Sequence, residues 1–430
     1  MPRALLDHRA AMLTDHEAHG SGAGRVAQEV NAFYERHPYP PPVDDLESYR
    51  KLWSEDRRRA EACLFWPDEP YREDRSILVA GCGTSQAAKH AMRWPRAKVV
   101  GIDVSATSIE KTEALRRKHG LDNLELHRLP VERVAELGRT FEHVVCTGVL
   151  HHLTDPDAGL RALRDVLEPG GAVHLMVYAP YGRAGVYLMQ DYCRRIGIGT
   201  TADEIKALTA SLRALPPDHP LMPLLRSAPD FKSEAGIADA LLHPQDRAYA
   251  VPQLLDFLRV GGFAFGRWME QATYLPQCGG LASSAHHPLL NRLPVEQQYA
   301  AVELFRGSMV RHSLVAYRDD GPDRAPVDFA GDAWLGYVPL RRPDTVMVQE
   351  RLQPGAAAVL INRHHSYTDL YLPITAQQKA LVDAIDGRRS IGEIAPDPVL
   401  RRVARVLFEG LWWYDQVVFD LSRARAGRSM

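Results

Sequence analysis

The chain has 430 residues, a formal net charge of −2 and 45% hydrophobic residues. This length suits two or three domains, and the near-neutral charge gives no global attraction to nucleic acid or an anionic membrane. The five cysteines form no CxxC pair, which argues against a disulfide framework or a cysteine zinc site. No apolar run reaches the ~20 residues that span a bilayer, and the N-terminus lacks the apolar segment of a secretory signal. We therefore expect a soluble cytoplasmic protein with no membrane partner.

The first 70 residues are expected to lie outside the main sheet. Residues 1–24 are polar and end rich in glycine, a composition typical of a flexible segment. Residues 25–70 are predicted to form an N-terminal helix and a Pro-rich strap, because apolar residues recur at helical spacing up to Tyr34 and prolines follow His37. The strap is either a packing element or a lid that brings Tyr34 and Tyr39 to a ligand cleft.

A glycine loop follows the first predicted strand. The apolar run Ile77–Ala80 leads directly into Gly81-Cys-Gly83 and then into a helical pattern. Glycines allow a sharp turn and a close approach of the backbone to a ligand, and the N-terminus of the next helix offers free N–H groups. Asp103 ends a second apolar run about 20 residues later, which is the spacing of a nucleotide-binding βαβ unit whose acid accepts from ribose hydroxyls.

Strands then alternate with helices, which predicts a parallel, doubly wound α/β sheet. Residues 180–250 interrupt the pattern with helical pieces separated by prolines, and a long insertion of this kind is usually functional. We predict that it forms a helical cap within a core domain of residues 71–318. The expected strands of the resulting seven-stranded sheet are 77–80, 98–103, 124–129, 141–148, 172–178, 263–269 and 313–317.

A smaller module is predicted over residues 327–425, after a polar, turn-rich linker. Capping-box signatures at Thr375 and Ser390 mark two helices, and a third helix at about 399–412 leads into an apolar strand at 416–420. Three helices followed by a strand predict a winged-helix-like α+β domain. Such a module is a possible site for a protein partner.

Four motifs stand in order in residues 75–178. They are Val79-Ala-Gly-Cys-Gly-Thr84, Val100-Gly-Ile-Asp-Val-Ser105, Cys146-Thr-Gly-Val-Leu-His-His-Leu-Thr-Asp-Pro156 and Leu167-Glu-Pro-Gly-Gly-Ala-Val173. With them the segment resembles a class I S-adenosylmethionine-dependent methyltransferase. A nicotinamide-type dinucleotide fold is the rival, but it requires a third glycine where Gln86 stands. The resemblance implies a Rossmann-like sheet with S-adenosylmethionine as cofactor, and it leaves the acceptor open.

The resemblance also implies roles for the residues around the loop. The glycines would approach the amino-acid tail, Asp103 the ribose, the loop after the third strand the adenine, and the fourth-strand exit the sulfonium. Many relatives carry an acid where Pro130 stands here. The expected cofactor-binding residues are Ala80, Gly81, Cys82, Gly83, Gln86, Asp103, Val104, Leu129, Pro130, Val131, Thr147 and Gly148.

Candidates for catalysis and acceptor binding lie at the C-terminal ends of the strands, where such sheets bind ligands. The catalytic candidates are His151, His152 and Tyr178; the histidines are either a general base or part of the scaffold, and Tyr178 either lines the acceptor pocket or packs under the cap. The segment 243–249 either recognises the acceptor or forms an ion-paired helix entry. The expected substrate-binding residues are Tyr34, Tyr39, Tyr181, Asp246, Arg247 and Tyr249.

No metal site is predicted. The pairs His286-His287 and His364-His365 lack partners at metal-ligand spacing and are interpreted as surface or loop histidines. The fourth-strand exit also lacks the Asp/Asn-Pro-Pro-Tyr typical of base-methylating enzymes of this fold, so nucleic acid is not an expected partner. We expect a methyltransferase acting on a small organic acceptor enclosed by strap and cap. The alternatives are a protein methyltransferase that recognises its target through the C-terminal module, and a non-catalytic cofactor-binding regulator.

Overall fold

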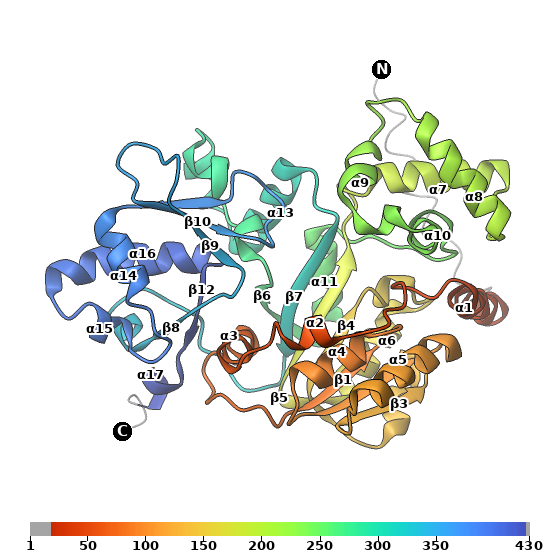
Figure 1. The fold of residues 1–430 in the computed structure, drawn as a ribbon, viewed down its shortest axis with the longest axis horizontal. Helices are drawn as coiled ribbons and strands as arrows, with labels where there is room; N and C mark the ends of the chain where they lie inside the picture. The colour runs from red at the N-terminus through yellow and green to blue at the C-terminus, as the bar shows by residue number, and fades with distance from the viewer. Residues whose placement is uncertain (1–18, 427–430) are drawn as a thin grey trace.

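The computed structural model describes residues 19–426 of the chain, and Figure 1 shows its fold. Most of the N-terminal segment that we expected to be flexible, residues 1–24, lies outside the described residues. Helix α1 (His19–Arg36) begins within that segment, ahead of the first apolar residue of the predicted helix. Among the described residues, no helix is both long and apolar enough to cross a membrane.

A seven-stranded sheet forms the centre of the molecule and confirms the predicted α/β fold. Its strand order is β3-β2-β1-β4-β5-β7-β6, with β7 antiparallel to both of its neighbours and β1 to β5 parallel. The strands are β1 (Ser76–Ala80), β2 (Lys98–Asp103), β3 (Leu124–Arg128), β4 (Phe141–Thr147), β5 (Leu167–Tyr178), β6 (Phe263–Trp268) and β7 (Arg311–Arg318). Strand β5 starts earlier than predicted, because the chain stays extended through Pro169 and the two glycines after it.

Alternating side chains of the central strands bury against helices on both faces of the sheet, as in a doubly wound fold. Leu78, Val144 and Val173 belong to one buried cluster with α6 (Pro156–Val166) and α11 (Val251–Val260). Ile77, Val79 and Val145 belong to a second cluster with α4 (Gln86–Arg93). The remaining helices of the core domain are α5 (Ala106–His119), α13 (Val295–Arg306), η2 (Val131–Leu137) and η3 (Leu150–His152).

The predicted helix boundaries in this core follow from their caps. The Ser105 hydroxyl accepts from Ser108 N at the start of α5, and Gly120 ends that helix in the left-handed conformation. The Asp155 carboxylate accepts from Ala158 N at the start of α6, with Pro156 at the first helical position.

The insertion after β5 forms a helical cap above the C-terminal ends of the strands, at the upper right of Figure 1. It has a small apolar core of its own, which includes Val186, Leu208 and Ile237. Helix α1 lies beside it. The elements of the cap are α7 (Ala184–Ile196), α8 (Ala202–Ser211), η4 (Leu212–Ala214), α9 (Met222–Ser227), η5 (Pro229–Lys232) and α10 (Glu234–Leu242).

The C-terminal module lies on the opposite side of the sheet, at the left of Figure 1. The three predicted helices and the last strand are present, as α14 (Ala376–Asp383), α15 (Ile391–Ile394), α16 (Pro398–Trp413) and β12 (Val417–Asp420). Four strands were not predicted: β8 (Val338–Arg341), which pairs with β12, and β9 (Thr345–Val348), β10 (Ala358–Asn362) and β11 (Tyr371–Ile374), which form a small antiparallel sheet. Short elements complete this half: η6 (Gln271–Thr273), η7 (Gly279–Ser283), α12 (His287–Leu290), η8 (Ala333–Gly336) and α17 (Ser422–Ala426).

Two helices of the N-terminal region were also not predicted, α2 (Glu47–Arg50) and α3 (Glu55–Phe65). The α3 side chains Leu64 and Phe65 are buried in one cluster with Val315 of the central sheet and Val418 of the C-terminal module. Helix α3 therefore joins the two halves of the molecule.

Candidate active site

The glycine loop after β1 is tightly enclosed. Gly81 and Gly83 have φ of 67° and 53°, a left-handed conformation that side chains disfavour. A Cβ at Gly81 would overlap the Val149 side chain, and one at Gly83 would lie 3.0 Å from Pro40 Cδ. The loop is thus closed in by the exit of β4 on one side and by the strap on the other.

Asp103 at the end of β2 holds this loop in place. Its Oδ2 accepts from Gly83 N at 2.8 Å and its Oδ1 from Ser105 N at 2.9 Å. Burial raises the pKa of the Asp103 carboxyl, and the hydrogen bonds from Ser105 and Gly83 act in the opposite direction. The carboxylate therefore links the glycine loop to the start of α5.

A cavity of about 320 Å³ opens beside Asp103, at the C-terminal ends of the strands. Nine of the twelve residues expected to bind the cofactor line it: Gly81, Gly83, Gln86, Asp103, Val104, Leu129, Val131, Thr147 and Gly148. Ala80, Cys82 and Pro130 do not. Ala80 and Cys82 are buried in the packing around β1, and Pro130 precedes η2 with its side chain outside the lining.

The strap and the cap together cover the cavity. Tyr34, Tyr39 and Pro40 line it from the strap side. Tyr34 donates its hydroxyl to Asp239 Oδ1 at 3.2 Å and Tyr39 to Asp230 Oδ1 at 2.5 Å. These bonds tie the strap to α10 and η5 of the cap.

Four charged residues that sequence reasoning missed also line the cavity: Arg183, Asp230, Asp239 and Arg311. Burial is the main cause that raises the pKa of Asp239, to about 7. The two acids lie in the segment predicted as a cap, but they belong to no motif. Their separation in sequence carries no signal of a shared site.

His152 reaches the cavity, whereas His151 does not. The Nδ1 atom of His152 is 2.7 Å from Gln245 O, so this nitrogen carries the proton and donates, and Nε2 keeps its lone pair. His151 is fully buried, with its ring centroid 4.0 Å from that of Tyr178 and 4.2 Å from that of His152. Burial lowers the pKa of both histidines. Tyr178, the third catalytic candidate, lines the cavity.

Arg183 and Asp246 form a buried ion pair beside the histidines. The pair measures 3.0 Å, and the two side chains are 6% and 3% exposed. The Arg183 guanidinium lies 3.5 Å from the ring centroid of Tyr178, which is a cation–π arrangement. Asp246, which does not line the cavity, therefore neutralises the positive charge of Arg183, which does.

Four of the six expected substrate-binding residues lie outside the cavity lining: Tyr181, Asp246, Arg247 and Tyr249. Asp246 is occupied by Arg183, and Tyr249 is buried against Phe257, with ring centroids 5.0 Å apart. Tyr181 is 40% exposed. Tyr34 and Tyr39 line the cavity as expected.

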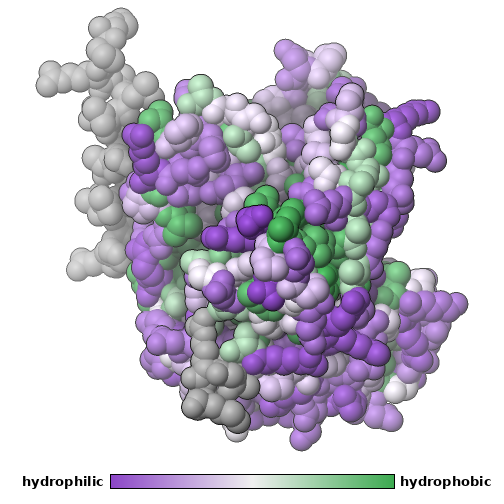
Figure 2. Space-filling view, turned by 90° about the vertical axis from the view of Figure 1, so that its left-hand side faces the viewer, coloured by the Kyte–Doolittle hydropathy of each residue, from purple (hydrophilic) through white to green (hydrophobic). Residues whose placement is uncertain are grey.

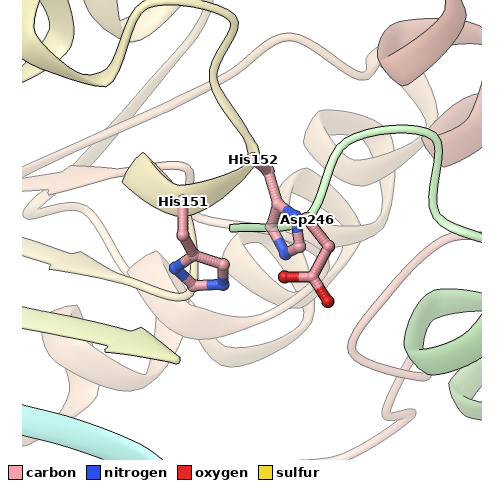
Figure 3. A group of neighbouring side chains, drawn as sticks. All are labelled: His151, His152 and Asp246. Carbon is pink, nitrogen blue, oxygen red and sulfur yellow. The ribbon is translucent and has the colours of Figure 1, made fainter. Parts of the chain in front are cut away.

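Among the described residues, two groups of His and acidic side chains have ligand atoms within 4.8 Å of one another: His151–His152–Asp246, drawn in Figure 3, and His152–Asp239–His243. In the second group, His243 Nδ1 accepts from Gln245 N, so the neutral ring carries its proton on Nε2 and cannot ligate through that atom. In the first, the guanidinium of Arg183 would repel a cation beside Asp246. The charges fit proton transfer better than metal binding.

The histidines of the pair His364-His365 lie in the turn and loop that follow β10. His364 lies 2.9 Å from Asp344 and is half exposed, in agreement with a surface position. His365 lies in the loop between β10 and β11, one of the two expected positions, and is buried there: its side chain is 1% exposed and lies 3.2 Å from Asp415. It packs there because Asp415 is buried and draws several donors around it.

Comparison with known proteins agrees with the resemblance. Residues 78–173 match the family model described as methyltransferase domain. The segment includes the end of β1, the glycine loop, Asp103, the exit of β4 and the start of β5. The chain carries a class I S-adenosylmethionine-dependent methyltransferase domain. S-adenosylmethionine is accordingly the cofactor of this domain.

The relatives match segments of very different length. An uncharacterized protein of Synechococcus sp. is 29% identical over 297 residues, which cover 65% of this chain and 69% of that protein. A ubiquinone biosynthesis O-methyltransferase of Bordetella avium is 34% identical over 105 residues, 24% of this chain and 42% of that enzyme. Since less than half of the Bordetella enzyme is matched, its acceptor does not transfer.

A solved structure shares its fold with most of the chain. PKMT2 from Rickettsia typhi, in complex with AdoHcy, has a TM-score of 0.63 and 15% identity, and the match covers 89% of this chain and 77% of that one. At this identity the match shows a shared fold. It covers more of the chain than the methyltransferase domain alone.

Proposed function

We propose that the methyltransferase transfers the methyl group of S-adenosylmethionine to a small organic acceptor inside the covered cavity. The observation that carries this proposal is the cover over the cavity. Tyr34 and Tyr39 line the cavity and are hydrogen-bonded to Asp239 and Asp230 of the cap. A covered cavity suits a small molecule better than an extended polymer.

The cofactor would lie along the loop and strand ends that line the cavity. Gly81 and Gly83 allow the backbone to approach its amino-acid tail, and Asp103 would accept from the ribose hydroxyls. Leu129 and Val131 would flank the adenine, and Thr147 and Gly148 the sulfonium. These assignments are supported by the motif order and by the common cavity.

The acceptor end of the cavity favours a protonated amine. Asp230 and Asp239 line the cavity with carboxyl groups. Two arginines line it as well: the charge of Arg183 is neutralised by Asp246, and Arg311 lies on strand β7. Aromatic rings that attract cations surround the two acids: Tyr34, Tyr39, Tyr178 and Phe231. The free Nε2 of His152 would accept the proton that an ammonium must lose before its nitrogen can attack a methyl group.

Matched compounds test this proposal. The purified chain is incubated with methyl-labelled S-adenosylmethionine and a panel of small amines, with alcohols and carboxylic acids of the same carbon skeletons. We expect label in amine products. We expect Asp239→Asn to lower this transfer at least ~10-fold, because a charge-assisted hydrogen bond contributes about 1.5–3 kcal/mol. The affinity for S-adenosylhomocysteine should stay unchanged in this variant. Preferred transfer to the alcohols or acids would disprove the amine assignment.

A further inference from the structure

His152 is held in a buried position by the segment 245–247. Acting as a base, this histidine becomes an imidazolium inside a buried wall, where an unpaired charge is costly. Its Nδ1–H is fixed on Gln245 O at 2.7 Å, and Arg247 N donates to the carbonyl of His151 at 3.1 Å. The segment around Asp246 therefore clamps the short helix η3 that carries both histidines.

Asp246 has one oxygen committed and one without a partner. Its Oδ2 accepts from Arg183 and from Gln190, each at 3.0 Å. Its Oδ1 is buried and has no hydrogen-bond partner. Figure 3 shows the carboxylate beside the rings of His151 and His152, and the ligand atoms of the three residues lie within 4.8 Å of one another. Asp246 does not line the cavity, so it faces the base and not the acceptor.

Other titratable and charged groups also surround His152. Two tyrosines, two histidines and two aspartates come from α1, η3, β5 and the cap, and Arg183 adds a positive charge. The full set that faces His152 is Tyr34, His151, Tyr178, Arg183, Asp239, His243 and Asp246. Asp239 is shared with Tyr34 and faces the acceptor, which leaves Asp246 as the carboxylate behind the ring.

We propose that Asp246 is a positioning residue for His152, holding its ring through the 245–247 segment and stabilising the positive charge that His152 gains when it takes the acceptor's proton. This inference rests on the proposed function, and it moves Asp246 from substrate recognition to support of the base. Arg183 and Gln190 keep the carboxylate oriented, as the third group of a base–orienter arrangement does.

The proposed step balances in atoms and charge. The ammonium of the acceptor gives one proton to His152 Nε2, and its freed lone pair attacks the methyl carbon. The new carbon–nitrogen bond forms as the sulfur–methyl bond breaks, and sulfur leaves as a neutral thioether. The product is a methylated ammonium ion, and His152 releases the proton to water afterwards. Asp246 stays ionised throughout.

A titration of His152 tests the inference without any acceptor. The full chain, with its histidine rings labelled with ¹³C and S-adenosylhomocysteine bound, is followed by NMR against pH. The signal of His152 is identified by its loss in His152→Gln. Removing a nearby negative charge disfavours the imidazolium, so Asp246→Asn is expected to lower the pKa of His152 by about one unit or more. Asp230→Asn, a cap carboxylate outside both histidine groups, is the matched control and is expected to shift it by less than about half a unit.

A second variant keeps the test decisive if Asp246→Asn does not fold. Arg183→Gln removes the cation that opposes protonation, so it is expected to raise the pKa of His152. A pKa that stays within about half a unit in both variants, or an equal shift in Asp230→Asn, overturns the inference. Calorimetry with S-adenosylhomocysteine on the same samples reports on the cofactor site, and the labelled acceptor panel reports on the proposed function, so failure of either is distinguished from failure of this inference.

Discussion

At the scale of single residues, Asp103 is the side chain on which the cofactor site depends most. It already accepts from the backbone of Gly83 and Ser105, and its carboxylate lines the cavity. A carboxylate in this place shapes the loop and offers its remaining lone pairs to a ligand.

Replacing Asp103 with Ala should weaken the binding of S-adenosylhomocysteine. Hydrogen bonds to an ionised group contribute about 1.5–3 kcal/mol, so we expect a loss of affinity of at least about 10-fold by calorimetry. Asp157→Ala, which removes an exposed acid on α6, serves as control and should bind as the original chain does. Equal affinity in the two variants would show that Asp103 does not hold the ribose.

Asp239 should make stability depend on pH. Its pKa is raised from 3.8 to about 7 by burial, so the folded state favours the protonated form and loses stability as pH rises from the unfolded pKa through 7. Asp239→Asn cannot ionise. Relative to the original chain, it should gain on the order of 2–3 kcal/mol in free energy of unfolding between pH 5 and pH 8.5. Denaturant unfolding at the two pH values measures this difference in free energy. If the stability of both proteins depended on pH in the same way, the raised pKa of the buried Asp239 carboxyl would be contradicted.

The sequence predicted those residues whose role is local. The glycine loop and Asp103 are set by contiguous motifs, so their meeting in one cavity follows from the βαβ unit. Asp230, Asp239 and Arg183 meet only because the cap folds back over the sheet, and nothing in the sequence ties them to the cavity. Asp246 stands in the segment 243–249, for which the sequence leaves acceptor recognition and an ion-paired helix entry open, and its pairing with Arg183 depends on where α7 begins.

At the scale of elements, the strap and α1 are fixed from two sides. Glu35 of α1 accepts from Ala106 N and Thr107 N at the start of α5, a favourable place for an acid at a helix N-terminus. His37 Nε2 lies 3.0 Å from Thr200 O in the cap. The lid is therefore tied to both the sheet domain and the cap.

The double change Tyr34→Phe and Tyr39→Phe should loosen this lid while it keeps both rings. It removes the hydroxyl bonds to Asp239 and Asp230, each worth roughly 1.5–3 kcal/mol when one partner is charged. Hydrogen exchange at the amides of His37 and Tyr39 and of residues 228–240 should accelerate at least about 10-fold. Tyr192→Phe, an exposed ring on α7, is the control, and exchange rates that match those of the control would show that the hydroxyls do not hold the lid.

The elements that sequence reasoning missed have a common physical cause. Strands β8 to β11 are four or five residues long, so each carries too few residues for its period to stand out. Helix α3 begins with a run of charged residues and buries its apolar side only at Ala60–Phe65. Its partners lie in two different parts of the chain, which local patterns do not report.

At the scale of the whole molecule, the C-terminal module is joined to the sheet through Asp415. This fully buried acid accepts from Ala272 N at 3.0 Å and lies within 3.2–3.4 Å of His365, Arg267 and Arg342. It has φ of 52°. The two halves therefore share one buried polar centre. The outer face of the module is mostly hydrophilic with scattered hydrophobic patches (Figure 2), and a protein partner for it stays a prediction.

Asp415→Leu should strongly destabilise the protein. The change leaves buried arginine charges without their anion, and breaking a buried ion pair by removing one partner costs about 3–5 kcal/mol. Unfolding by denaturant measures the loss, with Asp383→Leu, at an exposed position on α14, as control. A loss of the same size in both variants would contradict the role of Asp415 as the joint between the halves.

The most direct test of the central claim follows the methyl group itself. The purified chain is incubated with a cell extract and methyl-labelled S-adenosylmethionine, and the products are separated by size. We predict that label enters small molecules, that these are amines, and that Asp239→Asn lowers this incorporation. Label confined to macromolecules would contradict the small acceptor, and no label in any fraction would favour a regulator that binds the cofactor without transferring its methyl group.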